Sequence, residues 1–180
     1  HSLILKNNFF QWLCKNSNEM LVSRNLNLLQ EAIIKSCKIK MYFVNKDVNE
    51  KNVRMVLNFG HTFAHAIELQ NNYSKKINHG EAVIMGIMMA TKLSYLKRMC
   101  SLQTLTQLES IYKLNNLKYD IKKNFNKREY NKIIEHMVND KKNNDEKINL
   151  ILLKKIGQTT LPGSCKISTR ELKKVFTKII

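Results

Sequence analysis

Two histidines, His61 and His65, lie four residues apart in a segment that is otherwise strongly apolar. In a helix this spacing places both side chains on one face, where two imidazoles can reach a single metal ion or a single substrate. Arg54 and Asn58 continue the same face at helical spacing. Buried polar groups must be paired, so this stripe is either a structural network or the wall of a wet cleft. The residues alone leave both interpretations open.

A third histidine, His79, stands immediately before Gly80 and Glu81, at the start of the most apolar segment of the chain. The N-terminus of a helix offers free amides and the positive end of its dipole, which suit an anion such as phosphate. His79 could serve a ligand there or cap the helix, and its position favours neither role. A zinc protease is excluded, because Thr62 stands where the glutamate of such a helix should follow the first histidine.

The elements that position these side chains are predicted to be helices. The chain has 180 residues with only 5 Gly and 1 Pro, which fits one domain and excludes an all-β fold. Periodic apolar positions predict helices over residues 8–24, 27–44, 53–67, 82–96, 101–114 and 127–138. A β-prone run at 148–153 predicts a short strand, and a capping box from Ser168 to Glu171 predicts a last helix over 169–180. We therefore expect a mainly α, multihelical single domain over residues 1–180, with one short β ladder near 148–160.

The formal net charge of +17 suggests an anionic partner, such as nucleic acid, a membrane surface or a phosphorylated small molecule. The basic residues are spread along the whole chain and accompany an excess of Asn and Ile, which is typical of a compositional bias. A basic helical module that binds nucleic acid through residues 113–142 stays an alternative, with its densest run at 122–128. No apolar stretch approaches the ~20 residues that cross a bilayer, so we expect no membrane partner.

Four cysteines stand singly, without a CxxC pair, at Cys14, Cys37, Cys100 and Cys165. This pattern favours buried thiols in a reducing compartment over a disulfide framework or a zinc knuckle, so we expect a cytoplasmic protein. The first residues lack both an initiator Met and the layout of a signal peptide. The chain is therefore expected to be a piece that begins within a longer protein.

The three histidines belong to two specific motifs, one over residues 54–68 and one over residues 79–83 that is followed by Gly86 and Met88. Further segments in matching order lie at residues 9–13, 36–40, 47–50, 140–142 and 148–157. Together they resemble the 3-dehydroquinate synthase family over essentially the whole chain, although Ala64 stands where the family usually has glycine. The similarity is to the second, multihelical domain of the family. The nucleotide-binding α/β domain that precedes it in the family is absent from this chain.

The resemblance implies a site that uses NAD and a divalent metal, zinc or cobalt. His61 and His79 match the two metal-ligating histidines, and the family's third ligand, a glutamate, would precede this chain. His65 matches a histidine that contacts substrate and transfers protons, and Glu50 matches a carboxylate that accepts a proton. The NAD-binding residues would also lie in the missing domain. The other matches are substrate-binding side chains, namely Lys40, Arg54, Asn58 and one or both of Lys141 and Lys142.

The implied activity is that of a carbon–oxygen lyase of the shikimate pathway, which leads to chorismate and the aromatic amino acids. A seven-carbon 2-keto-3-deoxy sugar acid phosphate (DAHP) would be converted to 3-dehydroquinate and phosphate, through transient oxidation by NAD, phosphate elimination, reduction and aldol closure. The piece alone is expected to be inactive, and the full enzyme is expected to be a homodimer. Another sugar phosphate cyclase of the same fold stays an alternative.

Overall fold

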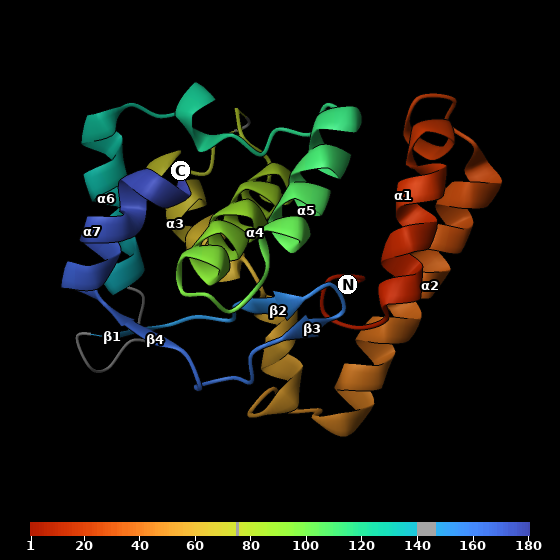
Figure 1. The fold of residues 1–180 in the computed structure, drawn as a ribbon, viewed down its shortest axis with the longest axis horizontal. Coiled ribbons are helices and arrows are strands. Elements are labelled where there is room, and N and C mark those ends of the chain that lie inside the picture. Colours follow the sequence, from red (N-terminus) through yellow and green to blue (C-terminus); the bar gives the residue numbers. More distant parts are fainter. Residues whose placement is uncertain (75, 140–146) are drawn as a thin grey trace.

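The computed structural model describes residues 1–74, 76–139 and 147–180, which are mainly helical as expected (Figure 1). The helical elements in chain order are α1 (Asn7–Leu21), α2 (Leu26–Lys46), the 3-10 helix η1 (Val53–Asn58), α3 (His61–Gln70), α4 (His79–Leu96), α5 (Leu102–Leu114), the 3-10 helix η2 (Ile121–Lys123), α6 (Lys127–Asn139) and α7 (Thr169–Ile179). The short strands are β1 (Lys147–Asn149), β2 (Leu153–Lys155), β3 (Gln158–Thr159) and β4 (Lys166–Ser168).

Helix α4 forms the centre of the structure, as its apolar sequence predicts. It packs against α3, α5 and α7, while the antiparallel pair α1 and α2 lies to one side (Figure 1). Buried Ser94 connects α4 to the strands, because its hydroxyl donates to the Ala90 carbonyl at 2.6 Å and accepts from the Leu153 amide at 2.9 Å. The polar group in the core is thereby satisfied, and β2 is held against the central helix.

Helices α3 and α4 pack closely against each other at Gly86. A Cβ added to Gly86 of α4 would overlap the carbonyl oxygen of Gly60 and lie 3.0 Å from the Ala64 amide nitrogen. Only a glycine allows two backbones to approach in this way. Ala64 itself is fully buried at this contact, so the core accommodates the methyl group that a glycine would lack.

The run predicted as one strand at residues 148–153 is divided between two ladders. Strand β1 pairs with β4, with Ile148 opposite Ile167, and β2 pairs with β3, with Leu153 opposite Thr159. The expected short ladder near residues 148–160 is confirmed as the β2–β3 pair, and β1 with β4 forms a second ladder. The two halves of the run pair with different strands. After β2 the chain turns back directly into β3, whereas β1 pairs with β4, which immediately precedes the last helix.

The ends of the helices largely follow the local sequence signals. Helix α7 begins where the capping box predicts, with the Glu171 amide donating to the Ser168 hydroxyl at 3.2 Å. All four thiols are free; Cys100 and Cys165 are buried as expected, whereas Cys37 is exposed on α2, so the expectation of a buried thiol is wrong there. Within the described part of the chain, no helix is long and apolar enough to cross a membrane.

Candidate active site

A break at Gly60 separates the polar residues that the spacing placed on one continuous helix. Gly60 has a φ of 83°, and an added Cβ would lie 2.6 Å from a side-chain carbon of Ile87. Its positive φ ends η1, and α3 begins at the next residue. The prediction of one helix over residues 53–67 is therefore wrong. Arg54 and Asn58 lie on η1, and only the histidine pair keeps the helical spacing, on α3.

The segment before η1 is organised by the carboxylate of Asp47. Its oxygens accept hydrogen bonds from the backbone amides of Lys51, Asn52 and Arg54, at 3.1, 2.7 and 3.1 Å. Short Asp side chains commonly close turns in this way. The turn holds Glu50 at a φ of 52°, a left-handed conformation that is uncommon for a residue with a side chain.

We predict that Asp47→Asn weakens the fold at neutral pH and flattens its dependence on acidic pH. Desolvation raises the pKa of Asp47, but the three amide donors and the charge of Arg54 outweigh it, so the folded pKa lies below the ordinary 3.8. A depressed pKa stabilises the fold above the unfolded value, and this stability is lost as the pH falls through the folded value. Urea unfolding midpoints measured from neutral pH into this acidic range test the prediction. Parallel curves for variant and wild type would contradict it.

Glu50 joins the two polar residues of η1. One of its oxygens accepts a 2.8 Å hydrogen bond from the Asn58 side-chain amide, and the other lies 3.7 Å from Nε of Arg54. Nη1 of Arg54 also donates to the Val48 carbonyl at 2.7 Å. The carboxylate, the amide and the guanidinium therefore form one connected group, and the remaining N–H donors of Arg54 are available to an anion.

The three histidines come together across the contact of α3 with α4. The ring centroid of His61 lies 5.7 Å from that of His65 and 5.7 Å from that of His79. In His61, Nδ1 lies 3.4 Å from the Phe59 carbonyl oxygen, and in His79, Nδ1 lies 2.9 Å from Oε1 of Glu68. A proton on Nδ1 of each ring serves these acceptors and leaves each Nε2 lone pair for a ligand.

The electrostatic environment keeps His61 in the form that a metal needs. Burial lowers the pKa of His61 below the ordinary 6.5, and the neighbouring His65 and His79 lower it further, although the Phe59 carbonyl raises it. His61 is therefore neutral at pH 7, as a metal-binding imidazole must be. Among the described residues, no group of three or more His, Cys, Asp or Glu side chains is placed to hold a metal ion. The imidazoles of His61 and His79 can thus form only part of a ligand set.

A hollow of about 970 Å³ opens beside this cluster. Its walls come from η1, from α3 and from the segments around β1 and β4. The size suits a small polar molecule. The lining residues are Glu50, Lys51, Asn52, Val53, Met55, Asn58, His61, Thr62, His65, Asn149, Leu150, Ile151, Leu161, Pro162, Gly163 and Lys166. Glu50, Asn58, His61 and His65 all line the hollow, so three of the four residues of the polar stripe border a cleft.

A family model described as "3-dehydroquinate synthase C-terminal" matches residues 1–143 of the chain. The chain belongs to the 3-dehydroquinate synthase family. It is 42% identical over 180 residues to the 3-dehydroquinate synthase of Pelagibacter ubique. This match covers 99% of this chain and 49% of that protein. It is 36% identical over 161 residues to the 3-dehydroquinate synthase of Dictyoglomus turgidum. This second match covers 89% of this chain and 43% of that protein. The chain therefore spans about half the length of the curated relatives it matches.

Solved structures share the fold of this member of the 3-dehydroquinate synthase family. A 2-epi-5-epi-valiolone synthase from Streptomyces hygroscopicus, solved with NAD⁺ and Zn²⁺ bound, superposes with a TM-score of 0.81 at 15% identity, over 99% of this chain and 48% of that one. A 2-deoxy-scyllo-inosose synthase in complex with carbaglucose-6-phosphate, NAD⁺ and Co²⁺ gives a TM-score of 0.68 at 22% identity, over 82% of this chain and 41% of that one. The predicted multihelical fold is thereby confirmed.

Lys40, a side chain expected from the 3-dehydroquinate synthase resemblance, does not line the hollow. It is exposed on α2. Lys141 and Lys142 lie outside the described residues. Two further members of the set, Arg54 and His79, are also absent from its wall, but they contact residues that line it, Glu50 and His61 respectively.

His79 is the first residue of α4 and does not cap it. The cap is Asn78, whose side chain accepts from the Glu81 amide at 2.9 Å, while the Glu81 carboxylate accepts from the Asn78 amide at 3.0 Å. The alternative in which His79 caps the helix is therefore wrong. The carboxylate of Glu81 occupies the N-terminal turn of α4, the position that would suit a phosphate, and it is paired with Lys118 at 2.8 Å.

Sequence reasoning missed two cations of the hollow and the partner of His79. Lys51 follows the Asp47 turn, and Lys166 reaches the wall because β4 pairs with β1, opposite Asn149. Neither lies in a motif, and the pairing of β4 joins segments that are far apart in the sequence. Glu68 falls inside the first motif, seven residues after His61, so its place in the motif was the one available signal.

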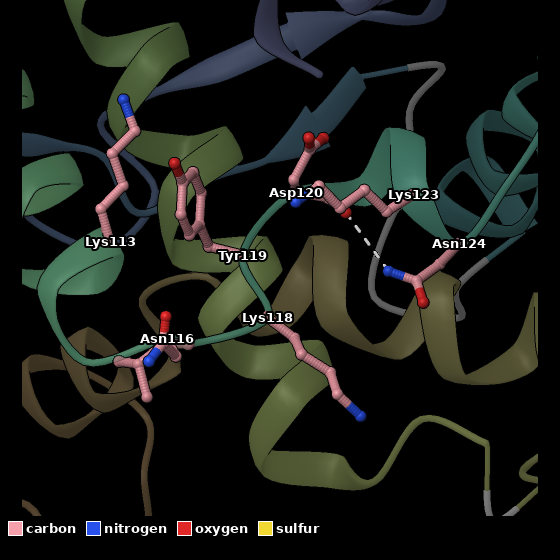
Figure 2. A pocket seen from close by; sticks show the side chains of 8 residues that line it. Lys113, Asn116, Lys118, Tyr119, Asp120, Lys123 and Asn124 are labelled. Carbon is pink, nitrogen blue, oxygen red and sulfur yellow. Dashed lines mark hydrogen bonds between the residues drawn. The ribbon is translucent and has the colours of Figure 1, made fainter.

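A second hollow of about 530 Å³ lies along residues 113–124, within the basic region considered for nucleic acid (Figure 2). Lys113 and Lys118 point in different directions in this view, and each is paired with an acid. Lys113 contacts Glu109 at 3.1 Å, and Lys118 contacts Glu81 at 2.8 Å. These cations therefore neutralise acids of the same chain rather than converge on one point of the hollow.

Proposed function

We propose that this chain supplies the metal- and substrate-binding part of a 3-dehydroquinate synthase, a carbon–oxygen lyase that converts DAHP to 3-dehydroquinate and phosphate in the shikimate pathway. The observation that carries the proposal is the meeting of His61, His65 and His79 beside a hollow that is also lined by Glu50 and Asn58. Membership of the family makes this site the place where its chemistry should be sought.

The donor atoms on this chain fit a divalent metal. The Nε2 atoms of His61 and His79 are the proposed ligands, because Nδ1 of each ring already has an acceptor. A further ligand and the binding of NAD are assigned to residues outside the described part of this chain. When bound, zinc or cobalt would polarise a substrate hydroxyl as a Lewis acid, and NAD would accept and return a hydride.

The residues of the chain itself bind the substrate and move its protons. Asn58 and His65 face the hollow and would orient hydroxyl groups, and the imidazole of His65 can both accept and donate a proton. Arg54 would bind a carboxylate or phosphate through the guanidinium edge that Glu50 and Val48 do not occupy. Lys51 and Lys166 add positive charge to the hollow, which suits a substrate that carries two anionic groups.

Glu50 is the proposed proton acceptor. Its carboxylate lies in the wall of the hollow and accepts from the Asn58 amide, so its orientation is set before substrate arrives. The left-handed backbone at this position is a local strain that the Asp47 turn maintains. Lys40, Lys141 and Lys142 remain proposed substrate contacts.

A chimera tests the proposed function. In it, this chain replaces the matching segment of the Pelagibacter ubique enzyme, so that the rest of a two-domain protein is present. With NAD and zinc, we expect release of inorganic phosphate from DAHP and formation of 3-dehydroquinate. A seven-carbon sugar phosphate without the carboxylate should be a poor substrate, because Arg54 and the lysines would lose one anionic partner.

The chimera also separates this function from that of other cyclases. His65→Ala and Asn58→Ala should lower the rate of 3-dehydroquinate formation, whereas His136→Ala on α6, outside the site, should leave it unchanged. A folded chimera that processes the sugar phosphate without the carboxylate, and not DAHP, would identify another sugar phosphate cyclase. A folded chimera that binds NAD and zinc but produces no 3-dehydroquinate would refute the proposal.

A further inference from the structure

The carboxylate of Glu68 holds the imidazole of His79 from the opposite helix. Glu68 lies near the C-terminal end of α3, and His79 is the first residue of α4. Oε1 of Glu68 lies 2.9 Å from Nδ1 of His79, within the range of a short hydrogen bond. The side chain of Glu68 is only 14% exposed, whereas that of His79 is 61% exposed. The buried carboxylate therefore restricts the more exposed imidazole.

His61 and His79 each have a hydrogen-bond acceptor at the same ring nitrogen, Nδ1, and the acceptor of His79 is the closer one. His61 has the Phe59 carbonyl oxygen at its Nδ1, and His79 has the Glu68 carboxylate at its Nδ1. An isolated neutral imidazole can carry its proton on either nitrogen, so a fixed acceptor at one nitrogen decides the tautomer. In both rings the acceptor is at Nδ1, and the lone pair is therefore left on Nε2.

We infer that Glu68 is a positioning residue, which keeps the proton of His79 on Nδ1 and thereby directs Nε2 toward a metal shared with His61. This inference rests on the proposed function, because that function supplies the metal. A carboxylate behind a ligating histidine fixes the orientation of the ring and raises its basicity. The role is needed more at His79 than at His61, since the side chain of His79 is largely exposed and is restricted less by its surroundings.

A purely structural role for the Glu68–His79 pair makes a different prediction. Helices α3 and α4 already pack closely around Gly86, and a polar pair with one largely exposed partner contributes little to stability. If the pair only joined the two helices, its removal would change stability slightly and leave metal affinity unchanged. The tautomer of His79 and the affinity for metal therefore distinguish a positioning role from a role that only joins the two helices.

The test uses Glu68→Ala and Glu68→Gln, with Glu109→Ala as the matched control. Glu109 is also partly buried and paired with a cation, but it lies on α5 and touches none of the three histidines. Nitrogen NMR of the metal-free chain at a pH of about 8, where histidine is ordinarily neutral, reports the tautomer of His79. Calorimetric titration with zinc reports affinity, for the chain and for the chimera.

Wild type and Glu109→Ala should show the proton of His79 on Nδ1, and Glu68→Ala should lose this preference. Zinc affinity should fall at least about tenfold in Glu68→Ala, and less in Glu68→Gln, because the amide oxygen can still accept from Nδ1. Unchanged zinc affinity in Glu68→Ala, with wild-type binding intact, would overturn the positioning role. Failure of wild type to bind zinc, with the tautomer still governed by Glu68, would instead contradict the proposed metal site and the role that rests on it.

Discussion

Zinc binding is expected to be lost when His61 is replaced by alanine. His61 lies between the other two imidazoles, with its ring centroid 5.7 Å from each, and it is neutral at pH 7 because burial lowers its pKa. Because His61 is a proposed direct ligand, its removal should reduce zinc affinity by more than about 100-fold, which exceeds the ordinary effect of a group that only contacts a ligand. Calorimetric titration of the chain and of the chimera measures this loss.

Two other histidines provide the controls. His136 on α6 is partly buried, and its Nε2 lies 3.3 Å from Oε1 of Gln70, away from the cluster, so His136→Ala should bind zinc like wild type. His65→Ala should also keep most of the zinc affinity while it lowers the rate of 3-dehydroquinate formation, because His65 is assigned to substrate rather than to metal. Wild-type zinc affinity in His61→Ala would refute the assignment, as would loss of zinc binding in His65→Ala alone.

The second large effect is expected from Gly86→Ala. The new Cβ would overlap the Gly60 carbonyl oxygen and approach the Ala64 amide nitrogen, and both are backbone atoms that cannot rotate away. Overpacking of this kind costs on the order of 3 kcal/mol, which outweighs the roughly 1 kcal/mol that alanine gains over glycine in a helix. We expect a strongly lowered urea midpoint or a protein that does not fold.

Gly80→Ala in the same helix is the matched control. Its Cβ would meet only the side-chain oxygen of Asn78, at 3.4 Å, which is ordinary contact. The free energy of unfolding should therefore stay the same or rise slightly.

If Gly86→Ala folds, it should also bind zinc more weakly, because α4 carries His79 and α3 carries His61. Equal unfolding midpoints for the two variants would show that the α3–α4 contact tolerates a side chain at Gly86.

The helices were predictable from the sequence because their signals are local. The apolar period of α1, α2, α5 and α6, the uniformly apolar α4 and the capping box at Ser168 are properties of neighbouring residues, and the structure confirms each of them. The spacing of His61 and His65 likewise survives, because both belong to one helix. The two histidine motifs were also sufficient to recognise the family.

Local patterns failed where a distant part of the chain decides the conformation. The apolar run at 53–67 continues a helical period, but Gly60 takes a positive φ where its backbone meets Ile87 of α4, and the helix is interrupted. The run at 148–153 looks like one strand, yet its halves pair with β4 and β3. The deciding contacts, of Gly60 with Ile87 and of β1 with β4, join residues that are far apart in sequence, so no window of a few residues contains them.

The candidate site divides in the same way. By itself, the sequence determined which side chains are available for chemistry, since residue type and helical spacing identify Arg54, Asn58 and the histidines. Only the tertiary structure decided which of them meet. The glycine contact between α3 and α4 brings His79 to His61 and Glu68 to His79, and the β1–β4 pairing carries Lys166 to the hollow. These approaches depend on how closely two backbones pack, and that distance is a property of the folded chain as a whole.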